Sequence, residues 1–266
     1  MASRTYPKNR LVLVIFVTTM VWLYTPLLYL IVQAFLENPY EWSHGFSLKW
    51  VTKLFSSATL WEPLRNSLIV AILAASASLI LGTLGAVTLS PHRILLPTWL
   101  HALITLPVMV PEVITGLSLL LFFLLLRIEL GMSTVILAHA SFSSSFVYFI
   151  VVEQLRKLDP NLREAALDLG AEPRALFWKI TLPNILPGLM GAWLFAFTLS
   201  FDDFLISFFT SGAGFTTLPL KIYSLMRLGI TPEVNALSAT MILISTALVL
   251  VALSREQTRK WVLKGF

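Results

Sequence analysis

The sequence predicts an all-helical membrane protein with six transmembrane helices. Only 12% of the 266 residues are charged and 57% are hydrophobic, whereas soluble domains carry about 25% charged residues. The mean hydropathy is +0.82, and several uncharged stretches approach the roughly 20 residues that cross the hydrocarbon core of a bilayer. We therefore expect residues 1–266 to form a single transmembrane domain. Because the chain has no cysteine, disulfides and thiolate metal sites are excluded.

The predicted spans follow the apolar stretches of the chain. The first begins directly after Lys8 and Arg10 and is longer than the apolar region of a signal peptide, which has about 7–15 residues, so we expect it to stay uncleaved. Before the last span, Thr231 is a suitable N-cap, Pro232 a suitable first helical residue, and Glu233 suits the positive end of a helix. In order, the spans are about 11–32, 68–89, 94–126, 134–152, 188–209 and 234–253.

The third predicted span is unusual because its 33 residues are too many for one crossing and too few for two. Pro97, Pro107 and Pro111 lie inside it, and each removes a backbone donor and disfavours a straight helix. This pattern predicts a broken or strongly kinked helix, which membranes tolerate where the backbone is packed in protein or lines a wet cavity. A tilted helix that enters from an interfacial segment is the alternative.

The basic residues predict the orientation of the chain, because Lys and Arg concentrate in cytoplasmic loops. With both termini inside, 13 of the 19 basic residues are cytoplasmic. The formal net charge of +5 is therefore a signal of topology, and no nucleic-acid partner is expected. The cytoplasmic set is Arg4, Lys8, Arg10, Arg93, Arg156, Lys157, Arg163, Arg174, Lys179, Arg255, Arg259, Lys260 and Lys264.

Residues 159–183, in the predicted cytoplasmic loop before the fifth span, have the pattern of two short amphipathic helices joined by a tight corner. Asp159 is an N-cap and Pro160 a first-turn residue, and Gly170 suits a left-handed position at the C-terminal end. We expect a second helix from Pro173 to Ile180, ended by Leu182 and Pro183. The apolar faces are Leu162, Ala166 and Leu169 on the first helix, and Leu176 and Ile180 on the second.

The same loop resembles the EAA motif of ABC importer permeases. The matching positions are Glu164, Ala165, Ala166, Gly170, Ile180, Leu182 and Pro183. The resemblance implies a type I importer permease fold in which this loop is a coupling helix that docks on a cytoplasmic ATPase dimer. It implies that Glu164 and Gly170 serve shape and docking and not chemistry. No G-x-x-x-x-G-K-[ST] loop occurs, so ATP is expected to bind the partner subunit and no cofactor is expected in this chain.

Acidic residues fall within two of the predicted spans, where each costs about 2.5–3.5 kcal/mol on insertion scales. Glu112 follows Pro111 in the third span, and Asp202 and Asp203 lie in the fifth. Counting residues along both helices places the three carboxyl groups at comparable depth in the outer half of the bilayer, which predicts a cation site in the substrate pathway. Neighbouring Asp side chains point in different directions on a helix, so one of them could instead cap a helix after a kink or hydrogen-bond Ser200 or Ser207.

Three segments resemble polyamine importer permeases of the spermidine/putrescine class: MVPEVITGLSLLLFF, FTLSFDDFLISFFTSG and TLPLKIYSLMRLGITPEVNAL. The resemblance implies import of a di- or polycation by alternating access across a bacterial inner membrane. It also implies three partners besides membrane lipid: a second permease subunit that makes a heterodimer, the ATPase dimer, and a periplasmic polyamine-binding protein. The class often has Asp where this chain has Glu112, which leaves the preferred polyamine open.

Two further residue types invite a functional interpretation. Tyr40, Trp42, Trp50 and Trp61 lie in the predicted outer loop, where aromatic residues normally anchor at the membrane interface. Trp50 is our candidate for a gate or a contact to the cation, since ammonium groups bind aromatic faces. His139, in the fourth span, is expected to be a polar group of helix packing and not a ligand.

Other functions remain as alternatives to polyamine import. The same architecture could carry another solute, such as an amine, an amino-acid-like molecule or a metal complex. An ion-coupled secondary carrier could use the same carboxylates for protons, but this interpretation leaves the loop at 159–183 unexplained. No pair of nucleophile and base is apparent in the sequence, so the chain is not expected to be an enzyme.

Overall fold

The computed structural model describes residues 10–37, 45–56, 58–89, 98–227, 232, 234–240, 242–243 and 246. The chain forms two compact units. We call Thr59–Lys221 the central unit and Met1–Ala58 with Ile222–Phe266 the terminal unit. Among the described residues the structure is helical, apart from one isolated antiparallel bridge between Leu36 and Phe46.

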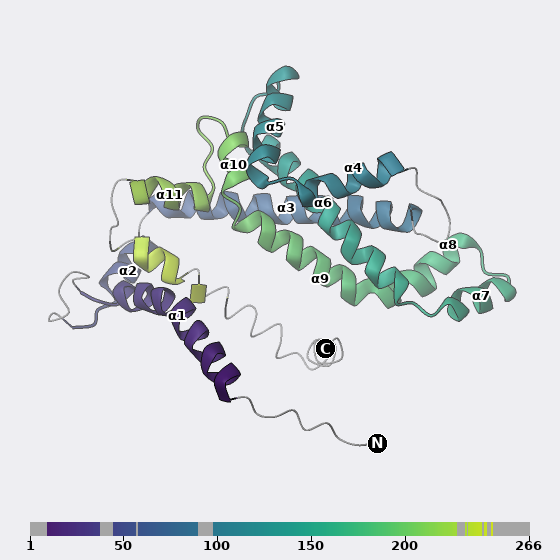
Figure 1. Cartoon of the computed structure of the whole chain (residues 1–266). Helices are drawn as coiled ribbons and strands as arrows, with labels where there is room; N and C mark the ends of the chain where they lie inside the picture. Colours follow the sequence, from purple (N-terminus) through teal and green to yellow (C-terminus); the bar gives the residue numbers. More distant parts are fainter. Residues whose placement is uncertain are drawn as a thin grey trace. The chain divides into compact units, whose positions relative to one another are not determined.

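The helices confirm the all-helical class (Figure 1). In chain order they are α1 (Arg10–Ala34), α2 (Lys49–Ser56), α3 (Ala58–Thr88), α4 (Thr98–Met109), α5 (Glu112–Leu125), α6 (Met132–Arg156), α7 (Pro160–Asp168), α8 (Pro173–Leu176), the π-helical turn η2 (Phe177–Thr181), α9 (Leu182–Phe201), α10 (Leu205–Thr210) and α11 (Leu218–Arg227).

Four described helices are long and apolar enough to cross a membrane, and a fifth span results if the bent pair α4 and α5 is one span. The four are Arg10–Ala34, Leu60–Thr88, Met132–Arg156 and Pro173–Phe201. They match the first, second, fourth and fifth predicted spans, although the second and fifth begin earlier than expected. Half of the predicted sixth span, 234–253, lies outside the described residues, as do Thr231 and Glu233 at its expected start.

The core of the central unit forms where α3, α6 and α9 meet. Small residues such as Ala75, Ala192 and Ala196 are fully buried there and let the helix backbones approach closely. Polar contacts also cross between these helices: for example, the Ser78 hydroxyl donates to the Ala140 carbonyl at 3.1 Å, and the Trp193 indole N–H donates to the Ser76 hydroxyl at 3.1 Å. This bundle is the scaffold that holds the breaks described below.

Gly82 marks the closest approach of α3 to α6. A Cβ atom added there would lie 2.7 Å from Val147 Cγ1 and 2.8 Å from the Ser144 carbonyl oxygen, which is backbone and cannot move aside. We expect Gly82→Ala to destabilise the protein by about 1–3 kcal/mol, the usual cost of overpacking. Thermal unfolding of the purified complex in detergent measures this. Gly191→Ala in α9 is the control, because no atom lies within 4 Å of its added Cβ; an equal change in both variants contradicts the expectation.

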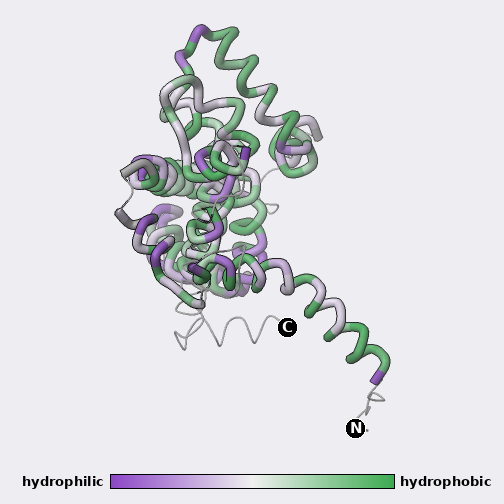
Figure 2. Tube along the Cα trace, turned by 90° about the vertical axis from the view of Figure 1, so that its left-hand side faces the viewer, coloured by the Kyte–Doolittle hydropathy of each residue, from purple (hydrophilic) through white to green (hydrophobic). Residues whose placement is uncertain are grey.

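In the terminal unit, α1 is hydrophobic along its length (Figure 2), and none of its most apolar 18 residues is buried. Within the part of the chain that the structure describes, its C-terminal end is covered: Ala34 packs with Ala236 and Ala239, and the Asn235 amide donates to Gln33 Oε1 at 3.0 Å. A helix with this pattern suits contact with lipid, as expected for the first span. Its end therefore packs against the described part of the predicted sixth span.

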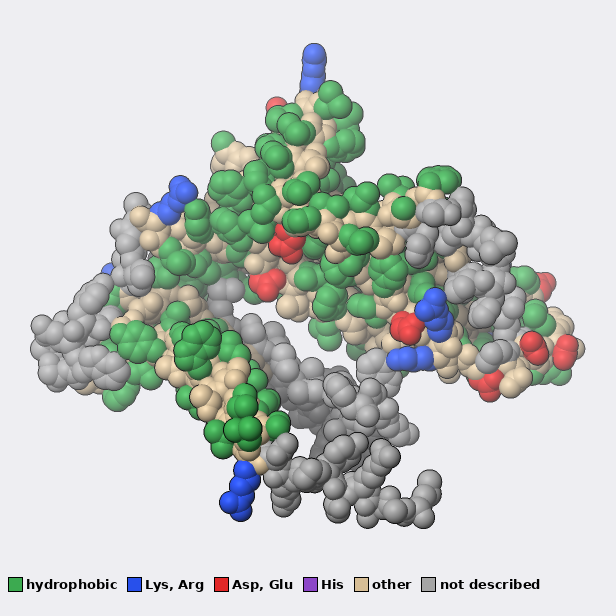
Figure 3. Space-filling model, in the orientation of Figure 1, with side chains coloured by type: hydrophobic (Ala, Val, Ile, Leu, Met, Phe, Trp, Pro, Cys, Tyr) green, Lys and Arg blue, Asp and Glu red, His purple; other side chains and the backbone are tan. Residues whose placement is uncertain are grey.

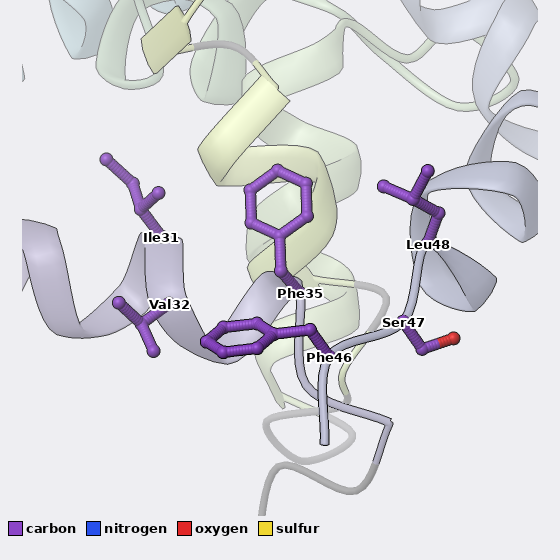
Figure 4. A pocket seen from close by; sticks show the side chains of 6 residues that line it. All are labelled: Ile31, Val32, Phe35, Phe46, Ser47 and Leu48. Atoms are coloured by element: carbon purple, nitrogen blue, oxygen red, sulfur yellow. The ribbon is translucent and has the colours of Figure 1, made fainter.

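A cavity of about 330 Å³ lies beside the end of α1 (Figure 4). Apolar side chains dominate its lining, which consists of Ile31, Val32, Phe35, Phe46, Ser47 and Leu48. Among the described residues, Ser47 is the single polar one in the lining, and none of the lining residues is charged. An apolar cavity of this kind offers nothing to compensate an ammonium group, so the charged candidates lie elsewhere.

The loop at 159–183 confirms the predicted first helix but corrects the second. The second helix begins at Pro173 as predicted, yet it does not end at Leu182 and Pro183: it continues through η2 into α9. Pro183 falls in the first turn of α9, directly after the π-helical turn that accommodates its ring and its missing N–H. Other donors satisfy the carbonyl groups around the π turn: the Leu182 N–H donates to the Phe177 carbonyl, and the Asn184 side chain donates to the Ile180 carbonyl at 2.7 Å.

Candidate functional site

The third predicted span is broken, as expected. α4 ends at Met109, α5 begins at Glu112, and their axes are bent by 117°. Pro111 sits between them in an extended conformation, with φ −55° and ψ 137°, and its ring cannot continue the helix of α4. Glu112 is consequently the first residue of α5, where the positive end of the helix dipole favours a carboxylate.

The fifth predicted span is also broken, at the two aspartates. α9 ends at Phe201 and α10 begins at Leu205. Asp203 accepts the backbone N–H groups of Ile206 at 3.3 Å and Ser207 at 2.8 Å, and so it caps α10. This confirms the alternative in which one aspartate caps a helix after a kink. Asp202 is the C-cap of α9, where the negative end of the helix dipole disfavours the negative charge of a carboxylate.

The two breaks lie side by side because α5 packs on α10 through Gly116. A Cβ atom at Gly116 would lie 2.8 Å from Phe209 Cδ2 and 3.3 Å from the Leu205 carbonyl oxygen. Glu112 is one helical turn before Gly116 and shares its face of α5. The charges of Asp202 and Asp203 accordingly act on the Glu112 carboxyl group. Sequence reasoning missed Gly116, although a glycine four residues after the acidic residue was a signal of a close contact.

The three carboxyl groups differ in exposure. Glu112 and Asp202 are exposed, whereas the Asp203 side chain is only 7% exposed and lies 3.1 Å from His139 Nε2. In the described part of the chain, no Lys or Arg forms an ion pair with Glu112 or Asp202. Figure 3 shows acidic side chains at the surface near the lower end of α5, surrounded by hydrophobic ones. The site therefore presents uncompensated negative charge in an apolar setting.

Enlarging Gly116 is expected to separate these groups. Gly116→Val drives a branched side chain against Phe209 and the backbone of Leu205 and Ile206, so α10 must move away from α5. We expect a loss of about 1–3 kcal/mol of stability, since the packing of α10 on α5 depends on this contact. Thermal unfolding measures the effect. Gly191→Val is the control for a branched residue in a helix, and equal behaviour of the two variants contradicts the assignment.

Trp50 lies in the terminal unit, on α2. Its indole N–H donates to the Glu37 carbonyl at 3.2 Å, and its ring packs in the cluster around Ala34. The ammonium groups of Lys49 and Lys53 lie 5.4 Å and 5.5 Å from the ring centroid. The ring thus already makes cation–π contacts within its own helix. Its role as a gate or as a contact to a cation stays a prediction.

The corner between α7 and α8 has the geometry that the loop motif predicts. The Asp159 side chain accepts the Asn161 N–H at 2.9 Å, and Pro160 begins α7. Gly170 adopts φ +79°. The N–H of Gly170 donates to Leu167 at 2.9 Å and that of Ala171 to Ala166 at 2.9 Å, which together form a Schellman motif.

The surface of this corner explains which motif residues are small and which are free to dock. Ala166 is only 7% exposed, and α7 packs against α8. Glu164 and Ala165 are exposed, Leu169 is 89% exposed and Trp178 is 64% exposed. Ile180 and Leu182 are half-buried, and Pro183 is exposed at the start of α9. The predicted shared face of α7 is therefore split, since Ala166 points inward while Leu162 and Leu169 remain exposed.

No group of three or more His, Asp or Glu side chains in the described residues is arranged to hold a metal ion. The chemistry available at the break is that of fixed charges and of the last carbonyl groups of α9, which have no partner within their own helix. Such an arrangement attracts and orients a cation.

Broken spans that expose charged groups, together with a structured loop between spans, define a multi-pass helical protein of the solute-transport class. Residues 78–256 match the family described as "Binding-protein-dependent transport system inner membrane component". The chain belongs to this family of inner-membrane permeases.

Characterised relatives cover most of the chain. The putrescine transport system permease protein PotI of Escherichia coli (strain K12) is 41% identical over 240 residues, which are 87% of this chain and 85% of the relative. The spermidine/putrescine transport system permease protein PotC of Haemophilus influenzae is 36% identical over 259 residues, 97% of this chain and 98% of the relative.

Solved structures confirm the predicted importer-permease fold. A bacterial ABC transporter for the import of alginate matches with a TM-score of 0.73 at 14% identity, covering 96% of this chain and 100% of that one. The MetNI methionine ABC transporter, in an inward-facing conformation, matches with a TM-score of 0.60 at 21% identity, covering 81% and 99%. At these identities the likeness concerns the fold alone.

Proposed function

We propose that the cargo of this permease is a polyamine, such as putrescine or spermidine, and that Glu112 and Asp202 compensate its positive charge during ATP-driven import. The observation that carries the proposal is the meeting of two helix breaks, each with an exposed carboxylate and no ion-pair partner among the described residues. The relatives named as putrescine and spermidine/putrescine permeases support it.

An ammonium group loses its hydration when it leaves water and needs other groups to compensate its charge. A charge moved into a membrane protein must be paired or well hydrogen-bonded. Asp202, Glu112 and the C-terminal carbonyl groups of α9 supply negative potential from two helices. Because the charges of the two carboxylates repel each other, a cation between them relieves a cost that the empty site bears.

Asp203 is less suited to this role than its neighbour. Its oxygens already accept two backbone N–H groups and lie against His139, which supports a structural function. Glu112 also has an alternative, structural role, because the positive end of the α5 dipole favours its carboxylate. Trp50 and Asp203 remain predicted pathway residues that only substitution can test.

We infer that the complex contains four kinds of subunit. This chain would pair with a second, different permease, bind a cytoplasmic ATPase dimer through residues 159–183, and receive cargo from a periplasmic polyamine-binding protein. Both termini would be cytoplasmic. In this arrangement, closure of the ATPase dimer moves the α7–α8 corner, and the continuous helix from Pro173 to Phe201 carries the movement to Asp202. The substrate pathway then alternates between outward-open and inward-open forms.

Uptake by the reconstituted complex tests the proposal. The two permeases, the ATPase and the binding protein are placed in liposomes, and labelled putrescine and spermidine are offered with ATP, with a non-hydrolysable analogue, or with an imposed proton gradient. We expect saturable uptake of a polyamine that requires ATP hydrolysis. Uptake driven by the proton gradient alone would indicate a secondary carrier, and ATP-driven uptake of another solute but of no polyamine would refute the cargo assignment.

A further inference from the structure

A buried polar cluster lies directly behind the break that presents Asp202. It joins His139 of α6 to Ser200 of α9, to Asp203 in the break and to Ser207 of α10. The side chains of His139 and Asp203 are 2% and 7% exposed, and both serines are buried. Three polar side chains, from α9, from α10 and from the break between them, thus meet at the imidazole ring of His139 on α6.

Both nitrogen atoms of the ring are engaged. Nδ1 lies 2.7 Å from the Ser200 hydroxyl, while Nε2 lies 3.1 Å from the Ser207 hydroxyl and 3.1 Å from Asp203 Oδ2. An ionised carboxylate only accepts hydrogen bonds, so the Nε2 hydrogen is directed at Asp203. The same carboxylate accepts the N–H groups of Ile206 and Ser207. Its hydrogen-bonding capacity is therefore used inside the protein.

This arrangement fixes the backbone on both sides of Asp202. Ser200 belongs to the last turn of α9, and Asp203 follows Asp202 directly, so the cluster holds the chain two residues before and one residue after the exposed carboxylate. α10 is held in turn against α5 through Gly116. The break that carries Asp202 and the helix that carries Glu112 are therefore both held against the same short helix, α10.

We propose that His139 is a positioning residue for the cargo site, holding the α9–α10 break in the geometry that presents the Asp202 carboxylate. The inference rests on the proposed function, because it assigns His139 a role through Asp202 in binding the cation. It differs from a packing role in its consequence: loss of the imidazole weakens cargo binding in complexes that are fully assembled.

Three variants grade the disturbance. His139→Leu removes both ring nitrogens, Ser200→Ala removes only the partner of Nδ1, and His139→Gln keeps a donor that can reach Asp203. Ser144→Ala is the control on α6, because its hydroxyl bonds the Ser141 carbonyl of its own helix at 2.8 Å. The readouts are the amount of assembled complex and the KM and maximal rate of ATP-driven putrescine uptake in liposomes.

If His139 positions Asp202, His139→Leu should raise KM by about tenfold. This is the lower end of the loss of affinity seen when a residue that orients a binding group through a hydrogen bond is replaced. Ser200→Ala should raise it less, and His139→Gln should restore most of the loss. In an Asp202→Asn background the His139 substitutions should have no further effect on KM, because the group they position is gone. If His139→Leu fails to assemble, the rise in KM expected for Ser200→Ala carries the test.

Unchanged KM in both Ser200→Ala and His139→Leu overturns the inference. Where His139→Leu does not assemble, unchanged KM in Ser200→Ala overturns it. So does a change in KM that is equally large in the Asp202→Asn background, which would indicate a general structural role. The proposed function fails separately: if Asp202→Asn alone leaves putrescine uptake normal, the cargo site lies elsewhere whatever the His139 variants show.

Discussion

Replacing Asp202 by Asn is expected to raise the KM for polyamine uptake about 30-fold, which corresponds to about 2 kcal/mol, the lower end for truncating one partner of a desolvated charge pair. The lower end applies because Asp202 is exposed and the site is open to water. Asparagine keeps the shape of the side chain, so the lost charge is the main change. Uptake kinetics of the reconstituted complex measure the effect.

Glu112→Gln should act in the same direction, and the double variant should lose more than either alone. Glu62→Gln, an exposed carboxylate in the early part of α3, is the matched control. Normal uptake in Asp202→Asn and Glu112→Gln, with the complex assembled in normal amounts, would show that these carboxylates do not meet the cargo.

The second large effect is expected at Gly170. Its φ of +79° lies in the left-handed region, which costs about 1–2 kcal/mol for other L-residues and more for branched ones. Gly170→Val should break the two hydrogen bonds that close α7 and misplace the corner that meets the ATPase. We expect ATP-driven uptake to fall more than tenfold, while insertion in the membrane continues because the spans are untouched. The measurements are the rate of ATP-driven uptake and the amount of cargo transported per ATP hydrolysed.

Asparagine offers a matched rescue at this position, because it tolerates the left-handed conformation better than other residues. Gly170→Asn should retain most of the transport that Gly170→Val loses. Equal transport by Gly170→Val and the unsubstituted complex would mean that the shape of the corner is irrelevant to coupling.

Local signals predicted much of what the structure shows. Pro111 marked the broken span because a proline interrupts a helix wherever the fold lies. Asp159, Pro160 and Gly170 marked the ends of α7 for similar reasons, since capping depends on a few neighbouring residues. These elements could be located without knowledge of tertiary contacts.

Features that depend on context were misjudged or left open. Pro183 was interpreted as a stop, although a proline in the first turn of a helix is compatible with a continuous helix once a π turn precedes it. The pairing of Asp203 with His139 joins residues far apart in the sequence and required the contact between α6 and α10. For this reason the sequence left open which aspartate would be free.

The central claim is that the cargo's ammonium groups are received by Asp202 and Glu112 where the two helix breaks meet. An experimental structure of the whole complex, trapped with putrescine between cargo release and ATP hydrolysis, tests this most directly. The account predicts an ammonium nitrogen at charge-assisted hydrogen-bond distance, about 2.7–2.9 Å, from the Asp202 carboxylate, with Glu112 nearby. Putrescine bound at a place that neither carboxylate reaches would contradict it.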